Sequence, residues 1–150
     1  MTIPTHLLAG MVIGKLTNNY GAALAGSVLI DLDHIISYSQ HKILFKPKVL
    51  LKTMRTESDP WQDQRNILHS VFSFAIIIIL LALVNFSFGL VFGLAYIAHL
   101  TLDMFDSADF HPFFPFKKIN LKGPFKFFSL CELLIDLALI LTLSFLIFSK

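Results

Sequence analysis

Charged residues are scarce in this chain of 150 residues: Asp, Glu, Lys and Arg make up 15% of it, against 55% hydrophobic residues. A soluble globular domain carries roughly 25% charged residues, and a disordered chain combines low hydrophobicity with high charge. The composition excludes both classes and predicts a membrane protein. The formal net charge of only +2 gives no basis for binding nucleic acid.

Cysteine is nearly absent as well. The single Cys131 excludes an internal disulfide and a cysteine-rich zinc site. The first residues, Met-Thr-Ile-Pro-Thr-His, lack the basic residues that open a cleavable signal peptide, so we expect this segment to be retained.

The longest stretch without a charged residue runs from Asn66 to Leu102 and contains 37 residues. A membrane-spanning helix needs about 20 residues. The stretch is therefore expected to divide at residues 85–87 into two antiparallel helices, near 67–84 and 88–105.

Three further apolar runs cover residues 7–16, 22–37 and 127–148. Together the runs predict an all-α, polytopic integral membrane helical bundle of about five helices, in two hairpins plus a C-terminal helix. We expect one integral membrane domain over residues 1–150, with polar loops at about 39–64 and 106–126. Glycines four residues apart, Gly10 with Gly14 and Gly89 with Gly93, would let the helices pack closely.

The basic residues predict the orientation of the bundle. Ten of the 12 lie in the two polar loops or at the end of the first: Lys42, Lys46, Lys48, Lys52, Arg55, Arg65, Lys117, Lys118, Lys122 and Lys126. Five crossings place both loops on the same side, and the positive-inside rule makes that side cytoplasmic.

Ionisable residues occur at the same end of every predicted helix, on the cytoplasmic side. They are His6, Asp31, Asp33, His34, His69, His99, Asp103, Glu132 and Asp136. Such groups are costly within a membrane and usually face the interior of a bundle, so their common depth predicts one shared polar site.

The residue types in this predicted site favour a divalent metal. His99 and Asp103 are four residues apart, which places both on one face of a helix. Imidazoles mixed with carboxylates suit zinc first, with manganese or iron as alternatives. Asp31 and Asp33 would point about 200° apart in a continuous helix, so either the helix ends there or only one of them binds metal.

An anion site is also predicted. Residues 59–62, Asp-Pro-Trp-Gln, are typical of a helix start, and a helix running on from there would put Arg65 and His69 on one face. A guanidinium grips phosphate or carboxylate in a bidentate fashion. We therefore expect a membrane lipid or another anionic, phosphate-bearing molecule as substrate or partner.

Simpler interpretations remain open for several of these residues. His6 is equally an interfacial polar residue, and the second interpretation of Asp31 and Asp33 is that they terminate their helix or cap a neighbouring one. Glu132 and Asp136 are as well suited to pairing with Arg65 or a loop lysine.

Five short motifs occur in a fixed order along the chain. They are residues 5–10 (Thr-His-Leu-Leu-Ala-Gly), residues 26–34 (ending Asp-Leu-Asp-His), residues 65–70 (Arg-Asn-Ile-Leu-His-Ser), residues 99–103 (His-Leu-Thr-Leu-Asp) and residues 112–116 (Pro-Phe-Phe-Pro-Phe). In order and spacing this series resembles the YdjM-like family of membrane-bound, metal-dependent hydrolases, over about residues 5–118.

The resemblance implies a hydrolase of the prokaryotic plasma (inner) membrane that uses a divalent metal ion. The metal positions that it carries over are His6, Asp31, Asp33, His34, His69, His99 and Asp103. As a hypothesis, Asp33 or Glu132 accepts a proton from water and Arg65 holds the anionic group of a lipid phosphoester. The alternative is a non-catalytic metal-binding structural or regulatory protein, or an inactive homologue of the hydrolases.

Overall fold

The computed structural model describes residues 1–56, 61 and 65–149. Over these residues the chain is all-α, with no strand beyond two isolated β-bridges. The helices are α1 (Ile3–Thr17), α2 (Tyr20–Val28), α3 (Leu32–Gln40), α4 (Pro47–Thr56), α5 (Val71–Val84), α6 (Phe86–Met104) and α7 (Leu130–Phe148), and the 3₁₀ helix η1 (Leu29–Asp31) joins α2 to α3. The predicted all-α helical bundle is confirmed.

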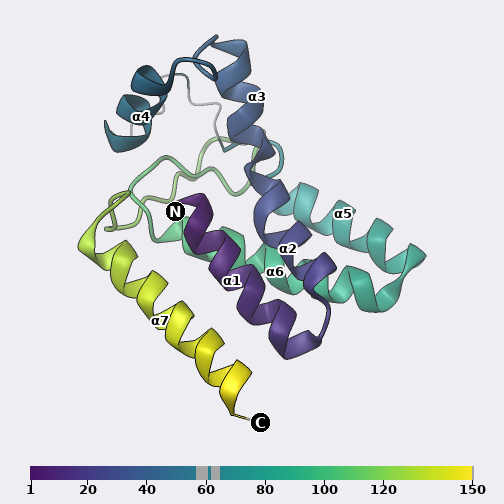
Figure 1. The fold of residues 1–150 in the computed structure, drawn as a ribbon. Coiled ribbons are helices and arrows are strands. Elements are labelled where there is room, and N and C mark those ends of the chain that lie inside the picture. Colours follow the sequence, from purple (N-terminus) through teal and green to yellow (C-terminus); the bar gives the residue numbers. More distant parts are fainter. Residues whose placement is uncertain (57–60, 62–64, 150) are drawn as a thin grey trace.

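The helices form the two predicted hairpins and a C-terminal helix. Helix α1 packs against α2, α5 packs against α6, and α7 lies along α1 (Figure 1). The hairpins join where α2 meets α6, and the buried residues there include Ala22, Ala23, Phe92, Ala95 and Tyr96. The alanines let the two helices approach closely, and this contact holds the hairpins together.

Glycines sit where helix backbones come closest. A Cβ added at Gly26 would overlap the backbone carbonyl of Phe92 on α6. A Cβ at Gly89 would lie 2.7 Å from the Cα of Ala82 on α5, so close packing at this glycine is confirmed.

Two helices, α6 and α7, are long and apolar enough to cross a membrane, and α5 is apolar but shorter, with 14 residues. Half of α6 is buried inside the protein, whereas α7 buries only Glu132 and Leu143. The remaining apolar residues of α7 need an apolar environment, which a bilayer supplies. The count of five crossings stays a prediction.

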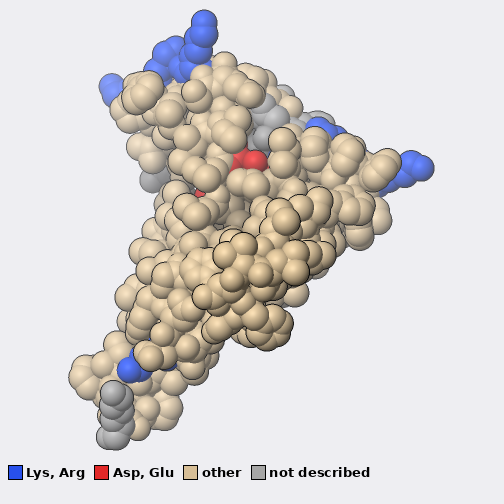
Figure 2. Space-filling model, turned by 90° about the vertical axis from the view of Figure 1, so that its right-hand side faces the viewer, with Lys and Arg blue, Asp and Glu red and all other residues tan. Residues whose placement is uncertain are grey.

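Charged side chains gather at one end of the molecule. On the face shown in Figure 2, most of the Lys and Arg atoms lie at the height of α3 and α4 or just below, while the long tapering body is almost free of charge. On this face, acidic atoms reach the surface at the base of the upper part, in a hollow between it and that body.

The second predicted helix, 22–37, is wrong as a continuous helix. Helix α2 stops at Val28, η1 follows, and α3 continues to Gln40. The break lies at Asp31, which is 6% exposed. Its carboxylate points toward buried histidines, among them His99.

The start of the third predicted helix is also wrong. Residues 65–70 are irregular, and α5 begins only at Val71, with the Ser70 hydroxyl accepting a hydrogen bond from the Phe72 amide at 3.2 Å. Asp33 accepts from the Leu68 amide at 2.7 Å, and the Tyr96 hydroxyl donates to the Leu68 carbonyl. These side chains take the backbone groups that a helix would use. The predicted helix start lies outside the described residues, except for Trp61.

The described residues of the two predicted loops contain local structure. The first contains α4, which the sequence analysis did not expect. The second folds back on itself through bridges that pair Asp106 with Phe125 and Phe110 with Leu121.

Candidate metal centre

Six of the predicted site residues converge from five parts of the chain. His6 comes from α1, Asp31 from η1, His34 from α3, His69 from the segment before α5, and His99 with Asp103 from α6. They form three overlapping groups whose ligand atoms lie within 4.8 Å of one another: His6, Asp31 and His99; Asp31, His34 and His69; and His69, His99 and Asp103. We call these six residues the His/Asp cluster. Six of the nine residues predicted to share a polar site thus lie together, and Asp33, Glu132 and Asp136 are outside the three groups found among the described residues.

The cluster is almost entirely buried. The side chains of His6, His69, His99 and Asp103 are 0% exposed, and only His34 reaches the surface appreciably, at 19%. Buried polar groups are stable only when they find partners, so the partners of each ring nitrogen and carboxylate oxygen matter here.

Hydrogen bonds define the protonation of the two central histidines. The His99 Nδ1 lies 2.7 Å from the Ser27 backbone carbonyl, which can only accept a hydrogen bond. The His69 Nδ1 lies 3.2 Å from the Asp33 carboxylate. Each Nδ1 is therefore the protonated nitrogen, and in a neutral imidazole the Nε2 keeps a lone pair.

These two lone-pair nitrogens face each other. The Nε2 atoms of His69 and His99 are 3.2 Å apart. The Asp103 Oδ2 lies 3.2 Å from the His69 Nε2 and 3.4 Å from the His99 Nε2, and the Asp31 Oδ1 lies 3.9 Å and 3.7 Å from the same two atoms. Four electron-rich atoms thus surround one small space.

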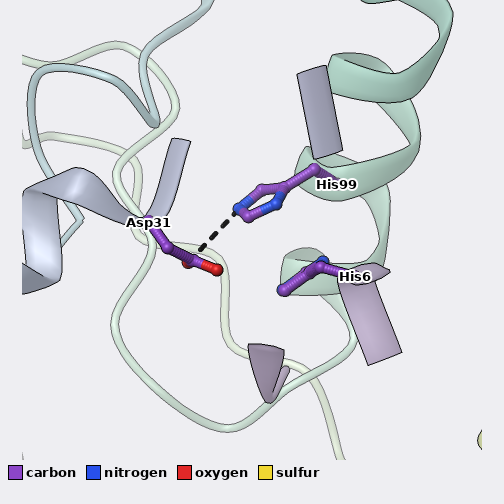
Figure 3. A group of neighbouring side chains, drawn as sticks. All are labelled: His6, Asp31 and His99. Atoms are coloured by element: carbon purple, nitrogen blue, oxygen red, sulfur yellow. Dashed lines mark ion pairs between the residues drawn. The ribbon is translucent and has the colours of Figure 1, made fainter. Parts of the chain in front are cut away.

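His6 and His34 flank this space. The His6 ring stacks on His99 with 3.8 Å between ring centroids, and its Nε2 lies 3.2 Å from the Asp103 Oδ1. Figure 3 shows His6, Asp31 and His99 pointing toward one another from separate elements. On the other side, the His34 Nε2 lies 3.4 Å from the Asp31 Oδ1.

Several of these buried atoms have no hydrogen-bond partner among the described residues. They are both ring nitrogens of His6, the Nδ1 of His34, the Oδ2 of Asp31 and the Oδ2 of Asp103. A buried acceptor without a donor costs roughly 1–3 kcal/mol. Each residue can offer one ligand atom, so a divalent cation would satisfy one nitrogen of a neutral histidine and one oxygen of each carboxylate, and this donor set fits zinc, manganese or iron.

Asp33 was predicted as a metal ligand, and the structure places it behind His69. Its Oδ2 accepts from both the His69 ring and the Leu68 amide. A carboxylate on the far nitrogen of a metal-binding histidine fixes the orientation and protonation of the ring. In this structure Asp33 is thus placed to position a ligand.

Arg65 is buried, with 3% exposure, and faces two carboxylates. Its Nη1 donates to the Asp106 Oδ1 at 3.0 Å, and its Nη2 donates to the Asp103 Oδ1 at 3.1 Å and to the Asp106 Oδ2. Burial alone would lower the pKa of Arg65, but Asp103 and Asp106 more than offset this and raise it above its ordinary value. The guanidinium therefore anchors Asp103. The prediction that Arg65 and His69 share a helix face is wrong, because residues 65–70 are not helical.

Asp106 was missed in the sequence analysis. It is 2% exposed, and besides Arg65 it contacts the amino group of Met1 at 2.5 Å. Its position three residues after Asp103, just past the end of an apolar helix, was the available signal.

Glu132 lies apart from the cluster. Its carboxylate accepts from the Thr2 amide at 2.6 Å, the Thr5 hydroxyl at 3.2 Å and the Phe128 amide at 2.7 Å. A carboxylate at the N-terminus of α1 is favoured by the helix dipole. Glu132 thus ties α7 to α1, and neither it nor Asp136 belongs to the three groups found among the described residues.

Comparison with known proteins identifies the family of this chain. The family model described as YdjM inner membrane protein matches residues 1–149. Searches of the curated proteins and of the solved structures gave no match. Because this match covers nearly the whole chain, the protein belongs to the YdjM inner membrane protein family.

Proposed function

We propose that the protein is a metal-dependent hydrolase whose metal centre is the His/Asp cluster, near one surface of the membrane. The observation that carries the proposal is the 3.2 Å approach of two histidine Nε2 lone pairs, with two carboxylates beside them. With both Nε2 atoms unprotonated these four groups repel one another, and either a proton or a divalent ion between them turns the same contacts into attractive ones.

The residues that would hold the ion are His69, His99, Asp103 and Asp31, with His6 and His34 beside them. Zinc is our first choice, and manganese or iron the alternatives, because the set mixes imidazole with carboxylate. The chemistry that such an ion supplies in hydrolases is Lewis acidity and activation of water near neutral pH.

The surrounding residues have roles that their contacts suggest. Asp33 holds a proton on the His69 Nδ1, and the Ser27 carbonyl does the same for His99. Neither base named from the sequence faces the space between the histidines, because Asp33 is engaged by the His69 ring and the Leu68 amide, and Glu132 by the N-terminus of α1. Arg65 acts as a positioning residue, since both ends of its guanidinium are engaged by Asp103 and Asp106.

We infer a phosphoester as the bond that is cleaved. In this reaction a water oxygen bonds to phosphorus, the ester P–O bond breaks, and the alcohol leaves with a proton from the water. By the positive-inside rule the basic residues of the two loops favour a site on the cytoplasmic side, and they also favour an anionic substrate at the membrane surface.

A second function is favoured by the degree of burial. Four members of the cluster are 0% exposed, which suits a closed structural metal site as well as a catalytic one. In that case the protein is a non-catalytic metal-binding structural or regulatory membrane protein.

Turnover of phosphoesters by the purified full chain tests the proposal. We expect the zinc- or manganese-loaded protein to hydrolyse bis(4-nitrophenyl) phosphate or phosphatidic acid, and His99→Ala to abolish the activity. His41→Ala is the matched control, because His41 stacks on Trp61 and belongs to none of the three groups. Full metal loading with no turnover above buffer would reject the hydrolase and favour the structural protein.

A further inference from the structure

An apolar pocket adjoins the segment that carries His69. One wall is formed by residues 114–116 and the other by Ile67, Ser70, Phe72 and Ser73, and the pocket has a volume of about 400 Å³. This volume is within the range of small-molecule sites, roughly 300–1,000 Å³. We propose that the pocket binds an acyl chain of an anionic phospholipid, which deepens and rests on the proposed function by naming its substrate class.

The pocket is built as an ordered site. The Ser70 hydroxyl donates to the Phe114 carbonyl at 3.0 Å, and the Val71 amide donates to the Pro112 carbonyl at 2.8 Å. The rings of Phe113 and Phe116 both pack edge-on against Phe72. The 112–116 segment is thereby fixed against the start of α5.

The position of the pocket points to a lipid. It opens at the first turns of α5, an apolar helix that has no buried residue. An acyl chain seated between Phe72 and Phe114 would continue along the exposed apolar surface of α5, which includes Ile76, Ile79 and Leu80. The acyl chain would thus lie against apolar side chains along its length.

Two lysines beside the pocket favour an anionic headgroup. The Lys117 Nζ lies 5.9 Å from the centre of the Phe114 ring, and Lys118 is exposed beside it. Lysine at a membrane surface attracts anionic lipids. In sequence His69 lies between the lining residues Ile67 and Ser70, so the segment that lines the pocket also carries a member of the His/Asp cluster.

Photo-crosslinking of the full chain in nanodiscs tests the pocket. The probe is phosphatidylglycerol with a diazirine in its acyl chain, and the labelled residues are mapped by mass spectrometry. We expect labelling concentrated on residues 67–73 and 113–116. Phosphatidylcholine with the same diazirine chain is expected to label these residues less.

Two variants make the test specific. Ser73→Phe fills the pocket and should reduce this labelling roughly tenfold, the effect of losing about two buried methylene contacts. Leu137→Phe on α7 adds a ring at a position that is 49% exposed and outside the pocket, and should leave the labelling unchanged. Equal labelling in Ser73→Phe and the parent protein, or labelling spread evenly over α5 and α7, would overturn the proposal. Equal labelling by the two headgroups would overturn its anionic part.

The crosslinking readout is independent of turnover, so the two proposals fail separately. Loss of pocket labelling in Ser73→Phe with no hydrolysis by any metal-loaded form would reject the hydrolase and retain the lipid pocket. Hydrolysis of long-chain phosphatidic acid that is equal in Ser73→Phe and the parent would reject the pocket and retain the hydrolase.

Discussion

At the scale of single residues, the site depends on groups that do not touch the space between the histidines. Asp33 orients His69, the Ser27 carbonyl orients His99, and Arg65 with Asp106 anchors Asp103. Outer groups of this kind typically change metal affinity 10–100-fold. The cluster is thus a two-layer arrangement in which ring orientation is fixed before an ion binds.

Asp33→Asn removes the charge behind His69. We expect zinc affinity to fall roughly 10–100-fold, because the His69 ring loses its fixed protonation and orientation. Competition with a chromogenic chelator measures the change. Asp109→Asn is the control, since Asp109 pairs with the exposed Lys122. Unchanged affinity in Asp33→Asn would refute the positioning role.

Arg65→Met leaves Asp103 and Asp106 without their guanidinium. Breaking a buried ion pair from one side costs about 3–5 kcal/mol, so we expect a large drop in the thermal unfolding midpoint in detergent. Lys122→Met breaks an exposed pair, for which about 0–1 kcal/mol is expected. Equal midpoints for the two variants would show that Arg65 does not anchor the site.

At the scale of helices, hydropathy located the helices, and side-chain hydrogen bonds determined where they end. The sequence analysis placed both hairpins and α7 correctly, because long apolar runs are strong signals. The break at η1 was one of the two interpretations left open for Asp31 and Asp33. The late start of α5 was missed, because it depends on contacts of Asp33 and Tyr96 with Leu68, which is distant in sequence. Asp106 was missed because the Arg65 partner is 41 residues away.

Gly26→Ala tests the contact between α2 and α6. The added methyl overlaps the Phe92 carbonyl, so the helices must separate and stability should fall by about 1–3 kcal/mol. In Gly21→Ala on the same helix, the added methyl meets only the Asn19 side chain at 4.0 Å, an ordinary van der Waals contact, and the change removes backbone freedom, so it should be neutral or slightly stabilising. Thermal unfolding of both variants in one detergent checks the difference. A Gly26→Ala protein as stable as the parent would contradict the close packing.

At the scale of the whole molecule, the protein has one polar end, which carries the site, and an apolar body suited to the bilayer. The sequence predicted this polarity because ionisable residues recur at one end of each helix. Which of them share a cluster needed the fold, since Glu132 lies at the same depth yet binds the N-terminus of α1.

The single cysteine reports the orientation. Cys131 is exposed at the start of α7, at the end of the helix nearest the site. We expect a membrane-impermeant maleimide to label it in inside-out membrane vesicles and not in right-side-out ones. Ser149→Cys in a Cys131→Ser background should show the reverse pattern. Labelling of Cys131 from the outside alone would place the site on the other side of the membrane.

The metal content of the purified protein tests the central claim most directly. Elemental analysis of the wild type, His69→Ala, His99→Ala and the control His41→Ala compares the four proteins after growth with zinc, manganese and iron. The account predicts at least one metal ion per chain in the wild type and the control, and its loss in the two cluster variants. A folded wild type without stoichiometric metal, or equal metal in all four proteins, would contradict it.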